Sequence, residues 1–298
     1  MAHRDAWPSL PLGEWRETYD SVHRWVQVAG KIRLSLSPPQ NHYWHVALYP
    51  NARGLTTSPI PCGETVFEMQ FDFQAHVLDI WTNDGDRRVL PLRAETVASF
   101  YGRVMEALRE VGVGCTIRTK PQEMEDITPF EEDHRPRAYD GEYVRRFWRI
   151  LLSTSEVLQE FRTGFVGKCS PVHFFWGSFD LAHTRFSGNL APPRKGVISG
   201  PSYSHEEYSV GFWPGGGAVD GPAFYAYAVP KPAGYENAAV RPAAARWNPT
   251  LGEFILMYDD VRQADDPRRT LREFLDSTYE AAARLENWDR AALEMEWK

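Results

Sequence analysis

The chain has 298 residues, of which 43% are hydrophobic and 24% are charged. This composition excludes a disordered, collagen-like or coiled-coil chain, and the length allows about two domains of roughly 150 residues each. The formal net charge of -7 argues against a nucleic-acid or membrane-surface partner, because both would require a basic surface.

The cysteines and the N-terminal residues indicate in which cellular compartment the protein is expected. Cys62, Cys115 and Cys169 are far apart and form no CxxC pair, which is typical of a reducing environment. The N-terminus lacks the apolar segment of a signal peptide, and no apolar stretch is long enough to span a bilayer. We therefore expect a soluble, cytoplasmic protein.

The first half of the chain alternates between helical and strand-like patterns. Apolar residues at steps of three and four predict a helix over 12–28, ended by Gly30, and a second helix over 95–111. Between them, the sequence predicts strands over 32–36, 42–49, 66–73 and 77–81.

An acidic, proline-containing segment separates this region from a second region of similar plan. The second region is predicted to contain helices over 142–161 and 267–285, and strands over 172–180, 208–213, 224–229 and 254–258. The expected fold is α+β, with mostly antiparallel sheets and packed helices. The expected domains are a first α+β repeat over 1–120, an acidic linker over 121–140, and a second repeat with long loop insertions over 141–298.

The two halves match each other in order. Gly30-Lys31 aligns with Gly167-Lys168, and the segment 42–53 aligns with 174–185, which pairs Trp44 with Trp176 and Arg53 with Arg185. The later helices also align, although any two amphipathic helices can be matched by chance. The sequence thus predicts an internal duplication, with a ligand cleft between the halves.

Several familiar chemical motifs are absent from the sequence. It contains no GxxxxGK[ST] loop, no HExxH helix and no GxSxG elbow, so we expect no nucleotide cofactor. The most reactive-looking segment is PSYSHEEYS, with Tyr203, His205, Glu206 and Glu207. In an extended chain Tyr203, His205 and Glu207 share one face, so His205 is a candidate general base whose partner is Glu207, Tyr203 or a residue from elsewhere in the chain. A solvated strand entry with an incidental histidine is the alternative.

The segment HFFWGSFD supplies further candidates. Asp180 ends an aromatic stretch and requires hydrogen bonds or a cation if it is buried. Ser178 has no nucleophile elbow around it and is retained as a binding residue. A metal site remains an alternative, because His and carboxylate side chains suit iron, zinc or copper, although their spacing does not enforce it. Its ligands would be His173, His183, His205 and Glu206.

Two arginines are candidate anion binders. Arg53 precedes a loop with three hydroxyl side chains, and Arg185 occupies the aligned position in the second half, so each could hold a carboxylate or phosphate. Structural arginines that bind loop carbonyls are the alternative. Aromatic residues make up 13% of the chain and supply candidate pocket walls and substrate contacts. These are Trp44, His173, Phe175, Trp176 and Trp213.

Long segments of the sequence resemble a known family. The motifs GKIRLSLSPPQNHYWHVALY, ARGLTTSPIP, SPVHFFWGSFDLAHTRFSG and SHEEYSVGFWPGG are similar to those of an uncharacterised, chiefly bacterial family catalogued as a domain of unknown function. The resemblance covers nearly the whole chain and implies no established activity, cofactor or catalytic residue. From the residues, we expect an enzyme that acts on a small polar or anionic metabolite, with a non-catalytic small-molecule or partner-binding protein as the alternative.

Overall fold

The computed structural model describes residues 6–295, which form two compact units. Unit 1 comprises the described residues up to Leu12, together with Arg149–His173 and the chain from Asp180 onward. Unit 2 comprises Gly13–Trp148 and Phe174–Phe179. The division falls within the helix α3 (Gly141–Thr163) rather than at residues 120 and 140, and the predicted acidic linker lies inside unit 2.

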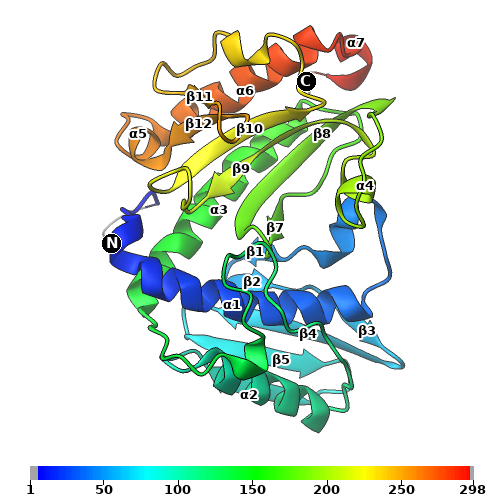
Figure 1. Cartoon of the computed structure of the whole chain (residues 1–298), viewed down its shortest axis with the longest axis vertical. Coiled ribbons are helices and arrows are strands. Elements are labelled where there is room, and N and C mark those ends of the chain that lie inside the picture. The colour runs from blue at the N-terminus through cyan, green and yellow to red at the C-terminus, as the bar shows by residue number, and fades with distance from the viewer. Residues whose placement is uncertain (1–5, 296–298) are drawn as a thin grey trace. The chain divides into compact units, whose positions relative to one another are not determined.

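Unit 2 combines helices with one antiparallel sheet (Figure 1). Its sheet has the strand order β1-β2-β4-β5-β6, with β3 paired to β4. Trp25 of α1 stacks on Phe100 of α2 at a centroid distance of 5.0 Å. The elements are α1 (Leu12–Leu36), η1 (Asn41–Val46), β1 (Tyr49–Asn51), β2 (Gly54–Thr56), β3 (Ile60–Cys62), β4 (Thr65–Asp72), β5 (Val77–Thr82), β6 (Arg87–Pro91), α2 (Val97–Glu110) and η2 (Phe130–Glu132).

The second antiparallel sheet has the strand order β11-β12-β10-β9-β8-β7, and its strands β8 to β12 lie in unit 1. Helix α6 runs along one face of this sheet (Figure 1), where the Tyr208 hydroxyl donates to the Leu275 carbonyl at 3.1 Å. Strand β7 (His173–Phe175) has only His173 in unit 1. The other elements of unit 1 are β8 (Asp180–Leu190), α4 (Ser199–Ser202), β9 (His205–Trp213), β10 (Ala223–Val229), η3 (Tyr235–Asn237), β11 (Arg246–Asn248), β12 (Glu253–Met257), α5 (Tyr258–Arg262), α6 (Pro267–Leu285) and α7 (Arg290–Leu293).

The α+β fold with antiparallel sheets is confirmed, as are the helices predicted over 95–111, 142–161 and 267–285. Both sheets are built largely from strands that follow one another along the chain. Such meanders are common in antiparallel folds, so this shared topology does not show a repeat. The internal duplication stays a prediction.

The predicted end of the first helix at Gly30 is wrong, and so is the strand predicted over 32–36. Helix α1 continues through Gly30 to Leu36. A Cβ atom at Gly30 would lie 2.3 Å from ring carbons of Trp176, so glycine serves here for close approach of an indole. The packing offsets the roughly 1 kcal/mol that glycine costs inside a helix.

The strands predicted over 42–49 and 172–180 are also largely wrong, because turns replace them. His42 and Tyr43 have positive φ angles of 54° and 57°, within η1. Strand β7 ends at Phe175, and a turn follows in which Phe179 has a φ of 61° and its N–H donates to the Phe175 carbonyl at 2.8 Å. The Phe179 ring packs on Phe147 of α3 at 5.1 Å, so burial of aromatic rings outweighs the strand propensity of this segment.

The acidic segment is fixed to α1 within unit 2. Arg24 forms an ion pair with Asp126 at 3.0 Å, and the Gln27 side-chain amide donates to the Gln122 carbonyl at 2.8 Å. Asp133 is buried and accepts hydrogen bonds from Arg135. The segment therefore packs as part of the unit although its composition resembles that of a linker.

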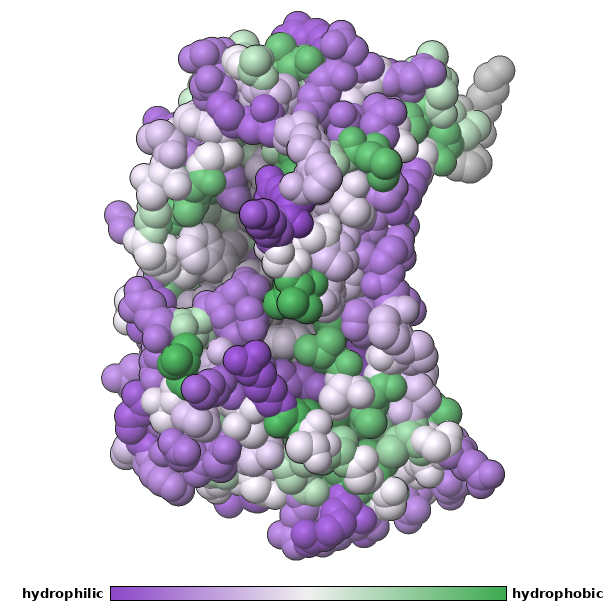
Figure 2. All heavy atoms as spheres, turned by 45° about the vertical axis from the view of Figure 1, so that its right-hand side comes forward, coloured by the Kyte–Doolittle hydropathy of each residue, from purple (hydrophilic) through white to green (hydrophobic). Residues whose placement is uncertain are grey.

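No helix within residues 6–295 is both long enough and apolar enough to cross a bilayer. On the face drawn in Figure 2, hydrophilic side chains predominate, and hydrophobic residues occur in small separate groups.

Replacement of Gly30 by alanine tests the close approach of Trp176. The new methyl group would overlap the indole, so we expect the G30A variant to lose roughly 1–3 kcal/mol of unfolding free energy. Gly102 is the matched control, because it lies inside α2 with no atom within 4 Å of an added Cβ. The G102A variant should gain about 0.5–1 kcal/mol from helix propensity. Denaturant unfolding measures both, and equal effects would contradict the packing argument.

Candidate functional site

The second sheet has two chemically different faces. Alternate residues of a strand share a face, and residues paired across antiparallel strands do as well. One face, which packs on α3 and α6, carries His183, Arg185 and Tyr208. The opposite face carries carboxyl and hydroxyl side chains, and we call it the polar face. Its polar residues are Asp180 and Thr184 of β8, Glu207 and Ser209 of β9, Tyr225 and Tyr227 of β10, and Glu253 of β12.

At one end of the polar face, Tyr225 bonds to Asp180. The Tyr225 hydroxyl donates to the Asp180 carboxylate, and both residues are buried. Gly211 lies between them in the register, and a Cβ atom there would come within 2.4 Å of the Tyr225 hydroxyl oxygen. Glycine at this position therefore lets the phenol cross the sheet surface to reach the carboxylate. Burial and the charge of Asp180 raise the pKa of Tyr225 well above its ordinary value.

Hydroxyl groups continue across the middle of the polar face. Thr184, Ser209 and Tyr227 are directly paired on three neighbouring strands, and the Thr184 and Ser209 hydroxyls are 3.1 Å apart. The Tyr227 side chain hydrogen-bonds to Ser209 and to Tyr203, which follows α4. The Tyr225 and Tyr227 rings stack with centroids 6.0 Å apart. The hydroxyl groups of these four residues therefore form a continuous row beside the stacked rings of Tyr225 and Tyr227.

Two carboxyl groups on the polar face have raised pKa values. Burial raises the pKa of Glu207 to about 8, although the positive charges of Arg194 and Lys168 act in the opposite direction. Burial and the negative charge of Asp180 raise the pKa of Glu253 to about 7. Glu207 is therefore largely protonated at neutral pH, and a protonated carboxyl can donate a hydrogen bond or a proton.

The other residues of the PSYSHEEYS segment occupy different places. His205 begins β9 on the same face as Glu207, and its Nδ1 lies 3.0 Å from the Ser204 hydroxyl. Glu206 points to the opposite side and accepts hydrogen bonds from Ser187 and Asn189 at 2.7 and 3.1 Å. The structure thus separates the two adjacent glutamates, and it brings Tyr203 near Glu207 through Tyr227.

The Arg185 guanidinium is enclosed by aromatic rings, and it forms no ion pair with an acidic side chain among the described residues. It lies 3.4 Å from the Phe161 ring centroid and 4.3 Å from that of Tyr279, and it donates to the Phe161 carbonyl. Burial lowers the pKa of Arg185 to about 10. This geometry favours the structural alternative, in which Arg185 joins β8 to α3 and α6.

The side chains considered as metal ligands do not lie together in the part of the chain that the structure describes. Among residues 6–295, no three His, Cys, Asp or Glu side chains are placed to hold a metal ion together. His183 is buried on the helix-covered face, where its Nδ1 lies 3.1 Å from the Ser170 carbonyl. Burial holds the pKa of His183 well below its ordinary value. His173 is buried at the start of β7, and His205 and Glu206 diverge at the start of β9.

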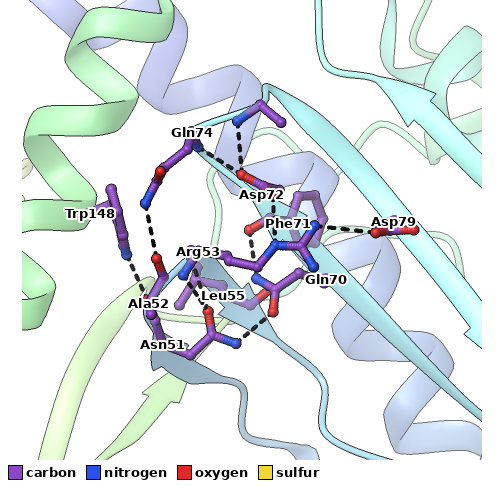
Figure 3. Close-up of polar contacts among 12 residues, drawn as sticks. Asn51, Ala52, Arg53, Leu55, Gln70, Phe71, Asp72, Gln74, Asp79 and Trp148 are labelled. Atoms are coloured by element: carbon purple, nitrogen blue, oxygen red, sulfur yellow. Dashed lines mark hydrogen bonds and ion pairs between the residues drawn. The ribbon is translucent and has the colours of Figure 1, made fainter.

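Arg53 of unit 2 lies opposite two carboxylates (Figure 3). Its Nε donates to Asp72 at 2.7 Å, and its Nη2 donates to Asp79 at 3.2 Å. Arg87 binds Asp79 as well, at 2.7 Å. A bound anion would face the negative charges of Asp72 and Asp79, so the geometry favours a structural role for Arg53.

The aromatic candidates are divided between the units. Trp176 is buried in unit 2, where its indole N–H donates to the Val46 carbonyl at 2.9 Å. Trp44 lies half-buried in η1 with its ring 5.3 Å from that of His42. Phe175 and Ser178 are half-buried around the turn after β7. Trp213 ends β9, and it packs partly exposed against the cluster that contains Tyr225.

Sequence reasoning missed five residues near the candidate site. Tyr225, Tyr227 and Glu253 alternate along their strands with apolar neighbours, so a period of two could have indicated a polar face. Only the strand register places them beside Asp180 and Glu207. The sequence carried no signal for the charges of Lys168 and Arg194 near Glu207. Arg194 stacks on Tyr203 at 4.5 Å, and Lys168 lies 4.7 Å from the ring centroid of Phe186, which pairs with Glu207.

Comparison with known proteins adds one match. The model of a protein family described as a family of unknown function (DUF5996) matches residues 7–295. No curated protein and no solved structure matches the chain.

The pKa of Glu207 predicts a dependence of stability on pH. The carboxyl binds its proton more tightly in the folded chain than in the unfolded chain, so its contribution to stability is complete below about pH 4.5. That contribution falls as the pH rises toward about 8. The loss approaches roughly 1.4 kcal/mol per pH unit within this window. Glu207→Gln should remove this part of the slope in urea unfolding measured from pH 5 to 8.

Glu206→Gln is the matched control, because Glu206 is the adjacent carboxylate on the other side of the strand. This variant should keep the slope of the unaltered protein. The interpretation of Glu207 is wrong if both variants change the slope equally, or if neither does.

Proposed function

Because the chain belongs to this family of unknown function, a family already indicated by its sequence motifs, we propose a function from its own residues. We propose that the protein is an enzyme that acts on a small polar or anionic metabolite at the polar face. The observation that supports this best is Glu207, a buried carboxyl that keeps its proton at neutral pH beside phenol hydroxyls and two cations. Perturbed ionisable groups of this kind cluster at functional sites more often than elsewhere.

The polar face supplies groups for both binding and proton transfer. The hydroxyls of Tyr203 and Tyr227 can donate to and accept from a polar ligand, while Arg194 and Lys168 favour a ligand with negative charge. Glu207 can act as the general acid, because its pKa lies near the working pH. The partly exposed Trp213 and Tyr227 rings supply an apolar surface for the carbon skeleton of the ligand.

Ligand binding is tested by a thermal-shift screen with simple carboxylates, phosphate esters and polyols. A compound that binds the native protein raises its midpoint of unfolding, and at a hundred times its Kd it stabilises by about 2.7 kcal/mol. We expect Tyr227→Phe to weaken the shift, because it removes the hydroxyl that joins Tyr203 to Ser209. Glu206→Gln is the control and should retain the shift. A shift that Tyr227→Phe leaves unchanged would place the binding site elsewhere.

Turnover of the identified compound separates catalysis from binding alone. NMR of the compound incubated with protein should show conversion, and Glu207→Gln should reduce kcat by about 100-fold or more while binding persists. Binding without conversion by the unaltered protein would instead support a non-catalytic binding protein. If no compound binds at the polar face, the proposal is wrong.

A further inference from the structure

The fold of unit 2 brings together two cysteines that lie far apart along the chain. Cys62 ends β3, and its thiol donates to the Gly114 carbonyl with an Sγ···O distance of 3.8 Å. Gly114 directly precedes Cys115. A carbonyl oxygen lies about 3 Å from the Cα atom of the next residue, so the Cys62 sulfur is within roughly 7 Å of the Cys115 Cα atom. The third cysteine, Cys169, belongs to unit 1.

The segment that carries Cys115 has a fixed course after α2. Gly112 has a positive φ of 78°, and the Val113 N–H donates back to the Leu108 carbonyl at 2.9 Å. Beyond this turn, Val113, Cys115 and Ile117 are more buried than the residues between them. Alternate side chains of an extended segment share one side, so the Cys115 side chain is directed toward the body of unit 2.

Both thiols lie where a small oxidant can reach them. Cys62 and Cys115 are half-buried, and the residues on either side of each cysteine are exposed. The backbone beside each thiol also has room to adjust, because a Cβ atom added at Gly63 or at Gly114 would meet no atom within 4 Å. Rotation of the two side chains, with small shifts of this backbone, can therefore bring the two sulfurs into contact.

The Cys115 thiol ionises less readily than a cysteine in water. Burial, together with the neighbouring Cys62, raises the pKa of the Cys115 thiol. The thiolate is the form that attacks an oxidant, so we expect Cys62, at the exposed turn between β3 and β4, to react first. Cys115 is then the resolving thiol, and an accessible cysteine beside a resolving cysteine is typical of redox-sensitive sites.

We propose that Cys62 and Cys115 form an oxidation site for peroxides, at which the two thiols are converted into a disulfide. With hydrogen peroxide, the Cys62 sulfur attacks the O–O bond and takes up one oxygen as a sulfenic acid, while the other oxygen leaves as water. The Cys115 sulfur then attacks the sulfenic sulfur, an S–S bond forms, and the hydroxyl group leaves as a second water. The two thiols together lose two electrons and two protons, which reduce the peroxide. The site uses no residue of the polar face, so it is independent of the function proposed above.

Oxidation of the reduced protein with hydrogen peroxide tests the proposal on the whole chain. The remaining thiols are alkylated, and peptide mass spectrometry without reductant identifies each linkage. We expect a peptide pair that joins Cys62 to Cys115 and is about 2 Da lighter than the two separate peptides together. Dithiothreitol should restore both thiols.

The same oxidation in urea is the matched control. Cys115 is almost equally distant along the chain from Cys62 and from Cys169, so loop closure favours neither pair in the unfolded chain. In the native protein the Cys62–Cys115 linkage should exceed the Cys115–Cys169 linkage by about tenfold or more, since folding holds only the first pair together. In urea the two linkages should form in similar amounts.

Two variants assign the steps. Cys115→Ser leaves Cys62 without a resolving thiol, so its sulfenic acid should accumulate and give about tenfold more dimedone adduct than in the unaltered protein. Cys169→Ser should still form the Cys62–Cys115 disulfide. The proposal is overturned if the native protein keeps both thiols in peroxide, or if it joins Cys115 to Cys169 as readily as to Cys62. Both of these results come from the unaltered protein, so they do not depend on the folding of either variant.

Discussion

The Tyr225 hydroxyl reaches the Asp180 carboxylate across Gly211, where any larger residue would meet both the phenol and the Leu181 carbonyl. This contact sets the position of the Tyr225 ring, and Tyr227 stacks beside it. The row of hydroxyls that continues through Ser209 follows from that arrangement. The arrangement of side chains on the polar face thus depends on Gly211, which leaves the space that the Tyr225 side chain occupies.

The two faces of this sheet treat ionisable groups differently. On the helix-covered face, rings surround the Arg185 guanidinium, and cation–π contacts partly replace its hydration. On the polar face, Glu207 and Glu253 reduce the penalty of burial by keeping their protons. A carboxyl group that keeps its proton is neutral, whereas an arginine becomes neutral only by losing its proton, which it holds strongly. The same sheet therefore carries a fixed positive charge on one side and proton-exchanging groups on the other.

The sequence predicted most helices well, because α2, α3 and α6 have continuous apolar periodicity and clear ends. The predicted helix end at Gly30 and the predicted strand through Phe179 were wrong, because aromatic packing between distant segments outweighs the local preference for secondary structure at both places. At the candidate site, alternation along β9 correctly separated Glu206 from Glu207. The contributions of Tyr225 and Glu253 could not be predicted, because they depend on the register of β10 and β12.

The short segment Phe174–Phe179 belongs to unit 2, although the residues on either side of it belong to unit 1. Its Phe174 pairs with Leu48 through two backbone hydrogen bonds of 2.8 and 2.9 Å, and its Trp176 fills the space at Gly30. During synthesis on the ribosome, the first 148 residues therefore lack part of their own core. Unit 2 can complete its packing only after residue 179 has left the exit tunnel.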